Sequence, residues 1–256
     1  MNIAVELARS SGAYLWVLLL GIAAAPPTGE FAENDAIAWL KERDLHKAKL
    51  AEKAAGVKDI LQRADVAHDV IDIYTEWTSV NNVVAHQARY ADIIAIGPDT
   101  AADGPLKHGV VDGALFHSDV PVLLIPRDAK PTLKPATVVV AWKDSLEAAR
   151  AVKEGIELLK SAKAVHVGMV DPDRYNGDPT GELGPYLLRH GVAFNSDILR
   201  SDGRTVVETL DQYADDVAAD MIIMGAYSHS RMRERIFGGV TLSVLENPKR
   251  PVFFAR

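Results

Sequence analysis

The chain has 256 residues, of which 48% are hydrophobic and 25% are charged, and its formal net charge is −7. Such a composition is that of a folded globular protein with one large core or two medium ones. The acidic excess gives no general attraction to nucleic acid or to an anionic membrane, because both require clustered positive charge. The absence of cysteine excludes disulfides, thiolate catalysis and cysteine-ligated zinc, and it fits a cytoplasmic protein.

The first apolar run, residues 14–25, reads YLWVLLLGIAAA and ends in small residues, as a secretory signal peptide does. It is too short to span a bilayer. The residues before it carry apolar side chains at helical spacing, and Glu6 offsets the charge of Arg9. We therefore predict a helix that leads into a buried strand rather than a cleaved signal.

Further along the chain, residues 41–58 mix charges of both signs at helical spacing. This pattern predicts a helix with a solvated face rather than a nucleic-acid patch. Residues 90–97 and 118–126 each contain a continuous apolar run, and we predict a buried parallel strand in the first and a short strand in the second. The second run directly follows a proline, which loses no ladder hydrogen bond at the first residue of a strand.

Residues 129–136 are rich in proline and charge, and we predict that they link a first unit, residues 1–128, to a second unit, residues 137–256. In the second unit, strand patterns alternate with helical ones, which predicts the α/β class with a parallel sheet covered on both faces. Ligands in such sheets bind beyond the carboxyl ends of the strands. The expected elements are a strand at 137–142, a helix at 146–160, a strand at 164–170, a polar loop through 184, a helix, a strand at 193–199, a helix at 205–218, a strand ending at 225, a long loop, a helix near 241 and a last strand.

The second unit repeats the first, so we expect the same architecture twice and expect the two units to pack on each other. The matching segments are 11–17 with 161–167, 90–97 with 219–225, and 118–126 with 247–255. The counterpart of residues 138–145 would precede Met1, so the first unit is expected to lack its first strand. Three explanations stay open: a true start upstream of Met1, a first unit reduced to a partial sheet, or another strand in the gap.

The most informative segment is residues 225–241, GAYSHSRMRERIFGGVT, which lies between a predicted strand and a predicted helix. Its spacing, with Gly225 as first and Gly238 as third glycine, resembles the nucleotide-binding members of the universal stress protein family, and the resemblance spans residues 135–256. Such a loop binds phosphate through backbone amides at a helix N-terminus, where glycine permits close approach.

The resemblance implies a tandem of two doubly wound parallel-sheet units of the adenine-nucleotide alpha-hydrolase-like kind, with the absent strand central in the sheet of the first. It implies a non-catalytic cytoplasmic stress-response protein whose candidate ligand is ATP or AMP. It also implies either a homodimer or paired units that mimic the dimer of the family.

Candidate binding residues follow three predicted strands or lie in the loop and the helix start after it. They are Lys143, Asp144, Ser145, Val170, Gly225, Ser228, His229, Gly238, Gly239 and Thr241. Lys143 stands where the binding members have an aspartate, Ser228 replaces their second glycine, and Gly239 replaces the serine or threonine after the third. The arginines at 231, 233 and 235 either add charge for a phosphate or form a solvated helical face.

These departures leave two functions open: a nucleotide-binding stress protein, or a dimerisation or adaptor module without nucleotide. A slow ATPase is a third alternative, for which no base, metal-binding carboxylate pair or Walker lysine is recognisable. The eight histidines show no close pairing with ligand spacing, so no metal site is predicted. His166 is expected to pack on a strand. The first unit keeps only a trace of the loop after Gly97, and its site is expected to be inactive.

Overall fold

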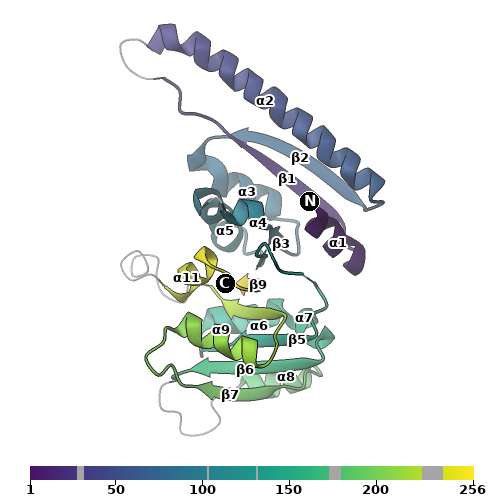
Figure 1. Cartoon of the computed structure of the whole chain (residues 1–256), viewed down its shortest axis with the longest axis vertical. Coiled ribbons are helices and arrows are strands. Elements are labelled where there is room, and N and C mark those ends of the chain that lie inside the picture. Colours follow the sequence, from purple (N-terminus) through teal and green to yellow (C-terminus); the bar gives the residue numbers. More distant parts are fainter. Residues whose placement is uncertain (28–31, 103, 131, 173–179, 227–238) are drawn as a thin grey trace.

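The computed structural model describes the whole chain except residues 28–31, 103, 131, 173–179 and 227–238 (Figure 1). It confirms the α/β class, with sheets in which parallel pairs predominate. None of the described helices combines the length and the apolar character needed to cross a bilayer. The names first unit and second unit are kept for residues 1–128 and 137–256.

In the second unit, helices and strands alternate in the predicted order. The elements are β5 (Thr137–Ala141), α6 (Leu146–Glu154), α7 (Ile156–Ser161), β6 (Ala164–Val170), α8 (Leu183–Arg189), β7 (Asn195–Leu199), α9 (Val206–Asp216), β8 (Met221–Gly225), α11 (Val240–Glu246) and β9 (Val252–Ala255). Their strands are parallel and lie in the order β7-β6-β5-β8-β9. The central strands β5 and β8 are buried along most of their length, as a parallel sheet covered on both faces requires.

The single helix predicted at 146–160 is two helices, α6 and α7, which meet at Gly155. A Cβ atom at Gly155 would lie 2.9 Å from the Ala151 carbonyl oxygen and 3.0 Å from the Ile223 side chain. The helix is therefore interrupted at a residue whose backbone lies close to the sheet. Prediction also placed the start of β7 at 193, two residues before the observed start at Asn195.

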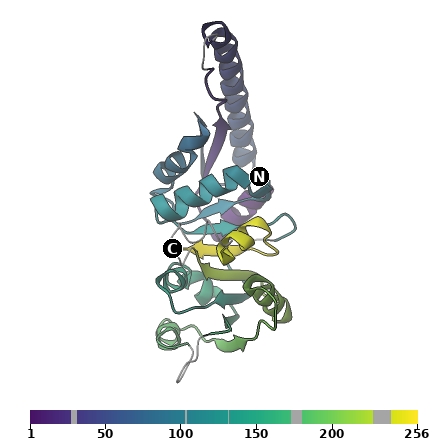
Figure 2. The same ribbon diagram turned by 90° about the vertical axis from the view of Figure 1, so that its left-hand side faces the viewer.

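The first unit has the same alternation but a divided sheet. Its elements are α1 (Asn2–Ser11), β1 (Leu15–Ile22), α2 (Ala32–Arg63), β2 (His68–Thr75), the 3-10 turn η1 (Trp77–Ser79), α3 (Val80–Ala88), β3 (Ile94–Ile96), α4 (Pro98–Ala102), α5 (Gly104–His117) and β4 (Val122–Leu124). The strands β1 and β2 form a parallel two-stranded sheet of their own, whereas β3 and β4 belong to the sheet of the second unit. The long helix α2 extends beyond the rest of the molecule (Figures 1 and 2).

The two units share one seven-stranded sheet, in the order β3-β4-β9-β8-β5-β6-β7. The junction is the antiparallel pair β4 and β9, in which Val122 lies opposite Phe254. Near it, the buried ammonium of Lys107 in α5 donates to the Leu245 carbonyl of α11 at 2.6 Å. A cation is favoured there because the last carbonyls of a helix carry partial negative charge.

Burial of the first-unit strands differs from the prediction. We predicted a buried strand in residues 14–25, yet none of the eight residues of β1 is buried, and the Trp16 side chain is 40% exposed. The run at 90–97 was also predicted to be buried, but Ala95 in the middle of β3 is exposed. The physical reason is that β1 and β3 are each paired along one edge alone in the described structure.

Candidate functional site

The candidate site lies beyond the carboxyl ends of β6, β5 and β8, which are neighbours in the sheet. The end of β5 is fixed by the Trp142 amide, which donates to the Gly168 carbonyl of β6 at 2.9 Å. Lys143 and Asp144 follow and are exposed. The topology thus brings the segment from Lys143 to Ser145 to the same sheet edge as Val170 and Gly225.

Ser145 is the N-cap of α6. Its hydroxyl oxygen accepts a hydrogen bond from the Ala148 amide at 3.2 Å, and its backbone is extended, with φ −151° and ψ 158°. This cap satisfies one of the amides that a helix start leaves unpaired. Ser145 therefore has a structural role in addition to its place in the candidate site. The next side chain, Leu146, is 87% exposed, and sequence reasoning did not single it out.

Gly225 lies where the end of β8 approaches the first turn of α6. A Cβ atom at this position would lie 2.5 Å from both the Ala148 nitrogen and the Glu147 carbonyl carbon, so only glycine fits without movement of the backbone. Gly97, its counterpart in the repeat, has no atom within 4 Å of such a Cβ. The first unit therefore lacks this close approach between strand end and helix start.

The helix after the loop begins at Gly239, the N-cap of α11, which has no side chain with which to cap the helix. Thr241 lies in the first turn and is buried, with 5% exposure. The other loop candidates, Ser228, His229 and Gly238, lie outside the described residues. The structure therefore places seven of the ten candidate residues and leaves the contacts of the loop as predictions.

Asp171 ties the ends of β6 and β7 together at the far side of the candidate site. Its carboxylate oxygens accept from the Ser201 amide at 3.3 and 3.4 Å, and its own amide donates to the Leu199 carbonyl at 3.0 Å. The position of Asp171 after a predicted strand was visible in the sequence, whereas its partner thirty residues later was not. It holds in place the sheet edge on which Val170 lies.

His166, in the middle of β6, contacts Tyr213 of α9. The rings meet edge to face with centroids 6.1 Å apart, and His166 Nδ1 lies 3.3 Å from the Tyr213 hydroxyl oxygen. The hydroxyl donates to the Asp197 carboxylate, and burial together with this carboxylate raises the pKa of Tyr213. The tyrosine therefore stays protonated near neutral pH. No group of three His, Asp or Glu side chains with metal-binding geometry occurs in the part of the chain that the structure describes.

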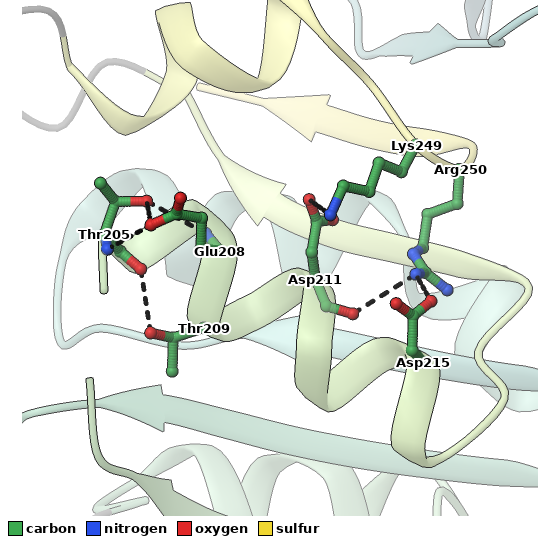
Figure 3. A network of polar contacts seen from close by, with 7 residues as sticks. All are labelled: Thr205, Glu208, Thr209, Asp211, Asp215, Lys249 and Arg250. Atoms are coloured by element: carbon green, nitrogen blue, oxygen red, sulfur yellow. Dashed lines mark hydrogen bonds and ion pairs between the residues drawn. The ribbon is translucent and has the colours of Figure 1, made fainter. Parts of the chain in front are cut away.

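A polar network fastens α9 to the segment before β9 (Figure 3). At the start of α9, Thr205 and Glu208 form a capping box. At its other end, the Arg250 guanidinium donates to the Ala219 carbonyl at 3.0 Å and to the Asp211 carbonyl at 3.4 Å, and it pairs with the Asp215 carboxylate. This clamp holds the two segments that flank β8.

We expect Arg250→Ala to lower the free energy of unfolding by about 1.5 kcal/mol near neutral pH, because it removes the donor of two carbonyl hydrogen bonds. The hydrogen bond from Arg250 also lowers the pKa of Asp215. A lowered carboxylate pKa contributes stability above the unfolded-state pKa, about 3.9, and this part is lost as pH falls through the folded value. The difference between variant and wild type should therefore shrink below about pH 4.

Urea unfolding of both proteins at a series of pH values measures this difference. Arg63→Ala is the matched control, because Arg63 pairs with Asp59 on the surface of α2, where the two side chains are 72% and 62% exposed. Such an exposed pair contributes less than about 1 kcal/mol. Equal losses of unfolding free energy in the two variants would contradict the stabilising role of Arg250. A loss in Arg250→Ala that does not depend on pH would also contradict it.

The second unit is thus a doubly wound α/β domain, with its candidate site beyond the carboxyl ends of three adjacent strands. The sequence profile of the universal stress protein family matches residues 136–256. Residues 136–256, the second unit, therefore form a domain of the universal stress protein family.

Solved structures resemble both units together. A universal stress protein from Archaeoglobus fulgidus DSM 4304 matches with a TM-score of 0.72 and 18% identity, over 99% of this chain and 90% of that chain. A functionally unknown protein from Pseudomonas aeruginosa PAO1 matches with a TM-score of 0.53 and 12% identity, over 100% of this chain and 94% of that chain. At these identities the likeness shows the fold alone. No curated protein sequence matches the chain.

Proposed function

We propose that the chain is a non-catalytic, cytoplasmic stress-response protein whose second unit binds an adenine nucleotide, ATP or AMP. The ligand would lie beyond the carboxyl ends of β5, β6 and β8. The observation that supports this proposal most is the close approach of Gly225 to the first turn of α6. It brings the start of the loop after β8 against the amino end of a helix, where backbone amides and the helix dipole favour an anion.

Side chains around this edge fit the same proposal. Exposed Lys143 offers a positive charge to a phosphate, although an ammonium cannot accept hydrogen bonds as the aspartate of the binding members does. The 87% exposed Leu146 offers apolar surface beside the same strand end. The chain as a whole carries a net charge of −7, so an anionic ligand requires a local site such as this one.

The second candidate function is a nucleotide-independent adaptor or dimerisation module. The observation that favours it is the antiparallel β4–β9 junction, which already joins two units into one sheet inside a single chain. The departures at Lys143, Ser228 and Gly239 favour it as well. A slow ATPase would need a positioned base, and the acidic groups at the described strand ends, Asp144 and Asp171, are both exposed.

Calorimetric titration with ATP, ADP and AMP tests the nucleotide proposal. We expect saturable binding of one nucleotide per chain, and at a ligand concentration of about 100 times Kd a gain in unfolding free energy of about 2.7 kcal/mol. Lys143→Ala should weaken binding about tenfold, as expected for the loss of a charge-assisted phosphate contact. Lys163→Ala is the matched control, because Lys163 is equally exposed but precedes β6 at the opposite edge of the sheet.

If none of the three nucleotides gives a binding signal in the calorimeter, the nucleotide proposal is contradicted. The adaptor function and the family assignment of the second unit would stand. Equal weakening by Lys143→Ala and Lys163→Ala would mean that the nucleotide binds elsewhere on the protein or through overall charge.

A further inference from the structure

The short helix α11 connects the candidate site with the first unit. It begins at two candidate binding residues, the N-cap Gly239 and the buried Thr241. Its residues Val244 and Leu245 belong to the same hydrophobic cluster as Val111 of α5, the helix that lies next to α11 in Figure 1. A helix of seven residues is not stable by itself, so these contacts decide where α11 lies.

A buried charge joins the two helices. The ammonium of Lys107 in α5, a residue that is 4% exposed, donates to the Leu245 carbonyl of α11 at 2.6 Å. Leu245 lies in the last turn of α11, where the carbonyl groups have no amide partner within the helix and carry partial negative charge. Lys107 therefore caps α11 with a side chain from the other unit.

The position of Lys107 is otherwise unfavourable for a cation. It lies in the first turn of α5, where the helix dipole disfavours positive charge, and burial deprives the ammonium of its water. Its acceptor in the described part of the chain is a neutral carbonyl rather than a carboxylate. An apolar side chain of similar size would avoid these costs. The placement therefore favours a positioning role for Lys107 over a purely stabilising one.

The length of α11 lets a change at its carboxyl end reach its amino end. Seven helical residues span about 10 Å, which is less than two turns. Without Lys107, the Leu245 carbonyl would lose its side-chain donor, and a buried carbonyl without a donor costs free energy unless the last turn moves toward water. Such a movement would also shift Gly239 and Thr241.

We propose that Lys107 is a positioning residue of the nucleotide site, which holds α11 from the first unit so that Gly239 and Thr241 keep their places. The inference rests on the proposed binding of an adenine nucleotide to the second unit. Because linkage is reciprocal, a nucleotide that fixes α11 strengthens the contact with Lys107 by the same factor. The first unit thus takes part in binding without a ligand of its own.

Calorimetric titration of ATP into Lys107→Met tests the affinity, at a temperature at which circular dichroism shows the protein folded. We expect binding at least about fivefold weaker than in the wild type, because methionine fills the space but cannot hold the last turn of α11. Asp119→Asn is the matched control. Asp119 of the first unit pairs with Arg150 of α6 at 4.0 Å, so this variant removes a contact between the units that does not involve α11. Asparagine tolerates the positive φ of this residue, and ATP should bind as it does to the wild type.

Hydrogen exchange measures the reciprocal effect. In the wild type, saturating ATP should slow exchange at the amides of residues 108–117 of α5, although they lie in the first unit. The slowing should be absent in Lys107→Met and present in Asp119→Asn. A residue that only stabilises the fold would not make α5 respond to a ligand of the other unit. The wild-type measurement decides the proposal even if Lys107→Met does not fold.

Wild-type affinity in Lys107→Met would overturn the proposal, and so would equal weakening in the two variants. Binding of ATP without slower exchange in α5 would overturn it as well. Each of these results would leave the proposed nucleotide function standing. If ATP does not bind to the wild type, the proposed function fails, and the role of Lys107 fails with it.

Discussion

Replacing Phe254 by alanine is expected to lower the free energy of unfolding by about 4 kcal/mol. Phe254 is completely buried in β9, where it lies opposite Val122 of β4 on one side and Met224 of β8 on the other. Loss of the ring would leave a cavity at the junction of the two units, and the surrounding side chains can collapse into it only in part. The loss should therefore be felt by both units.

Urea unfolding followed by circular dichroism measures the loss of unfolding free energy, and hydrogen exchange shows which strands are destabilised. Amides of β4 and of β8 should both exchange faster in the variant. Phe254→Leu is the matched control and should cost less than about 1.5 kcal/mol, because it keeps most of the apolar volume. A cost below about 1 kcal/mol for Phe254→Ala, or faster exchange confined to the second unit, would show that the β4–β9 junction does not couple the units.

The second large effect is expected at Gly225, where alanine should lower the free energy of unfolding by about 3 kcal/mol. The added methyl group would lie 2.5 Å from backbone atoms of Glu147 and Ala148, so α6 or the end of β8 must move. The same movement displaces the proposed phosphate position, and nucleotide affinity should fall with stability. Thermal unfolding and nucleotide titration of one sample measure both effects.

Gly97→Ala is the matched control, since Gly97 takes the same place in the first unit and an added Cβ has no neighbour within 4 Å. It should change the free energy of unfolding by no more than about 0.5 kcal/mol. Similar costs at Gly97 and Gly225 would refute the steric argument. They would also remove the reason for assigning the candidate site to the second unit.

Much of the second unit could be predicted, because its strands and helices differ in apolar period. The strand at residues 164–170 was predicted with its observed bounds. The break between α6 and α7 could not be predicted, since a single glycine within a helical pattern is usually tolerated, and here the contact of Gly155 with Ile223 decides the outcome. Such a contact joins residues that are distant in the sequence.

The first unit was harder to predict, because an apolar run indicates a strand but not whether neighbouring strands will cover it. β1 is a strand as predicted, yet it is only half-buried, because β2 is the one strand that pairs with it in the described structure. The antiparallel pairing of β4 with β9 also has no signal in the repeat, which predicts two parallel sheets. It arises because the last strand of each unit is an edge, and two apolar edges stabilise each other when they pair.

The candidate site was predictable to the extent that topology places strand ends together. Lys143, Val170 and Gly225 lie at one sheet edge because parallel strands end on the same side. The capping role of Ser145 depends on the local path of α6. The clamp of Arg250 could not be predicted, because its partners lie in α9 and in the segment after it, more than thirty residues earlier in the chain.

Hydrogen exchange of the full chain with and without saturating ATP tests most directly where the ligand lies. We predict that ATP slows exchange at the amides of residues 143–148 and 225–226 and at the start of α11, while those around Gly97 keep their rate. Slower exchange around Gly97, or no change at the strand ends of the second unit when ATP is bound, would contradict the account.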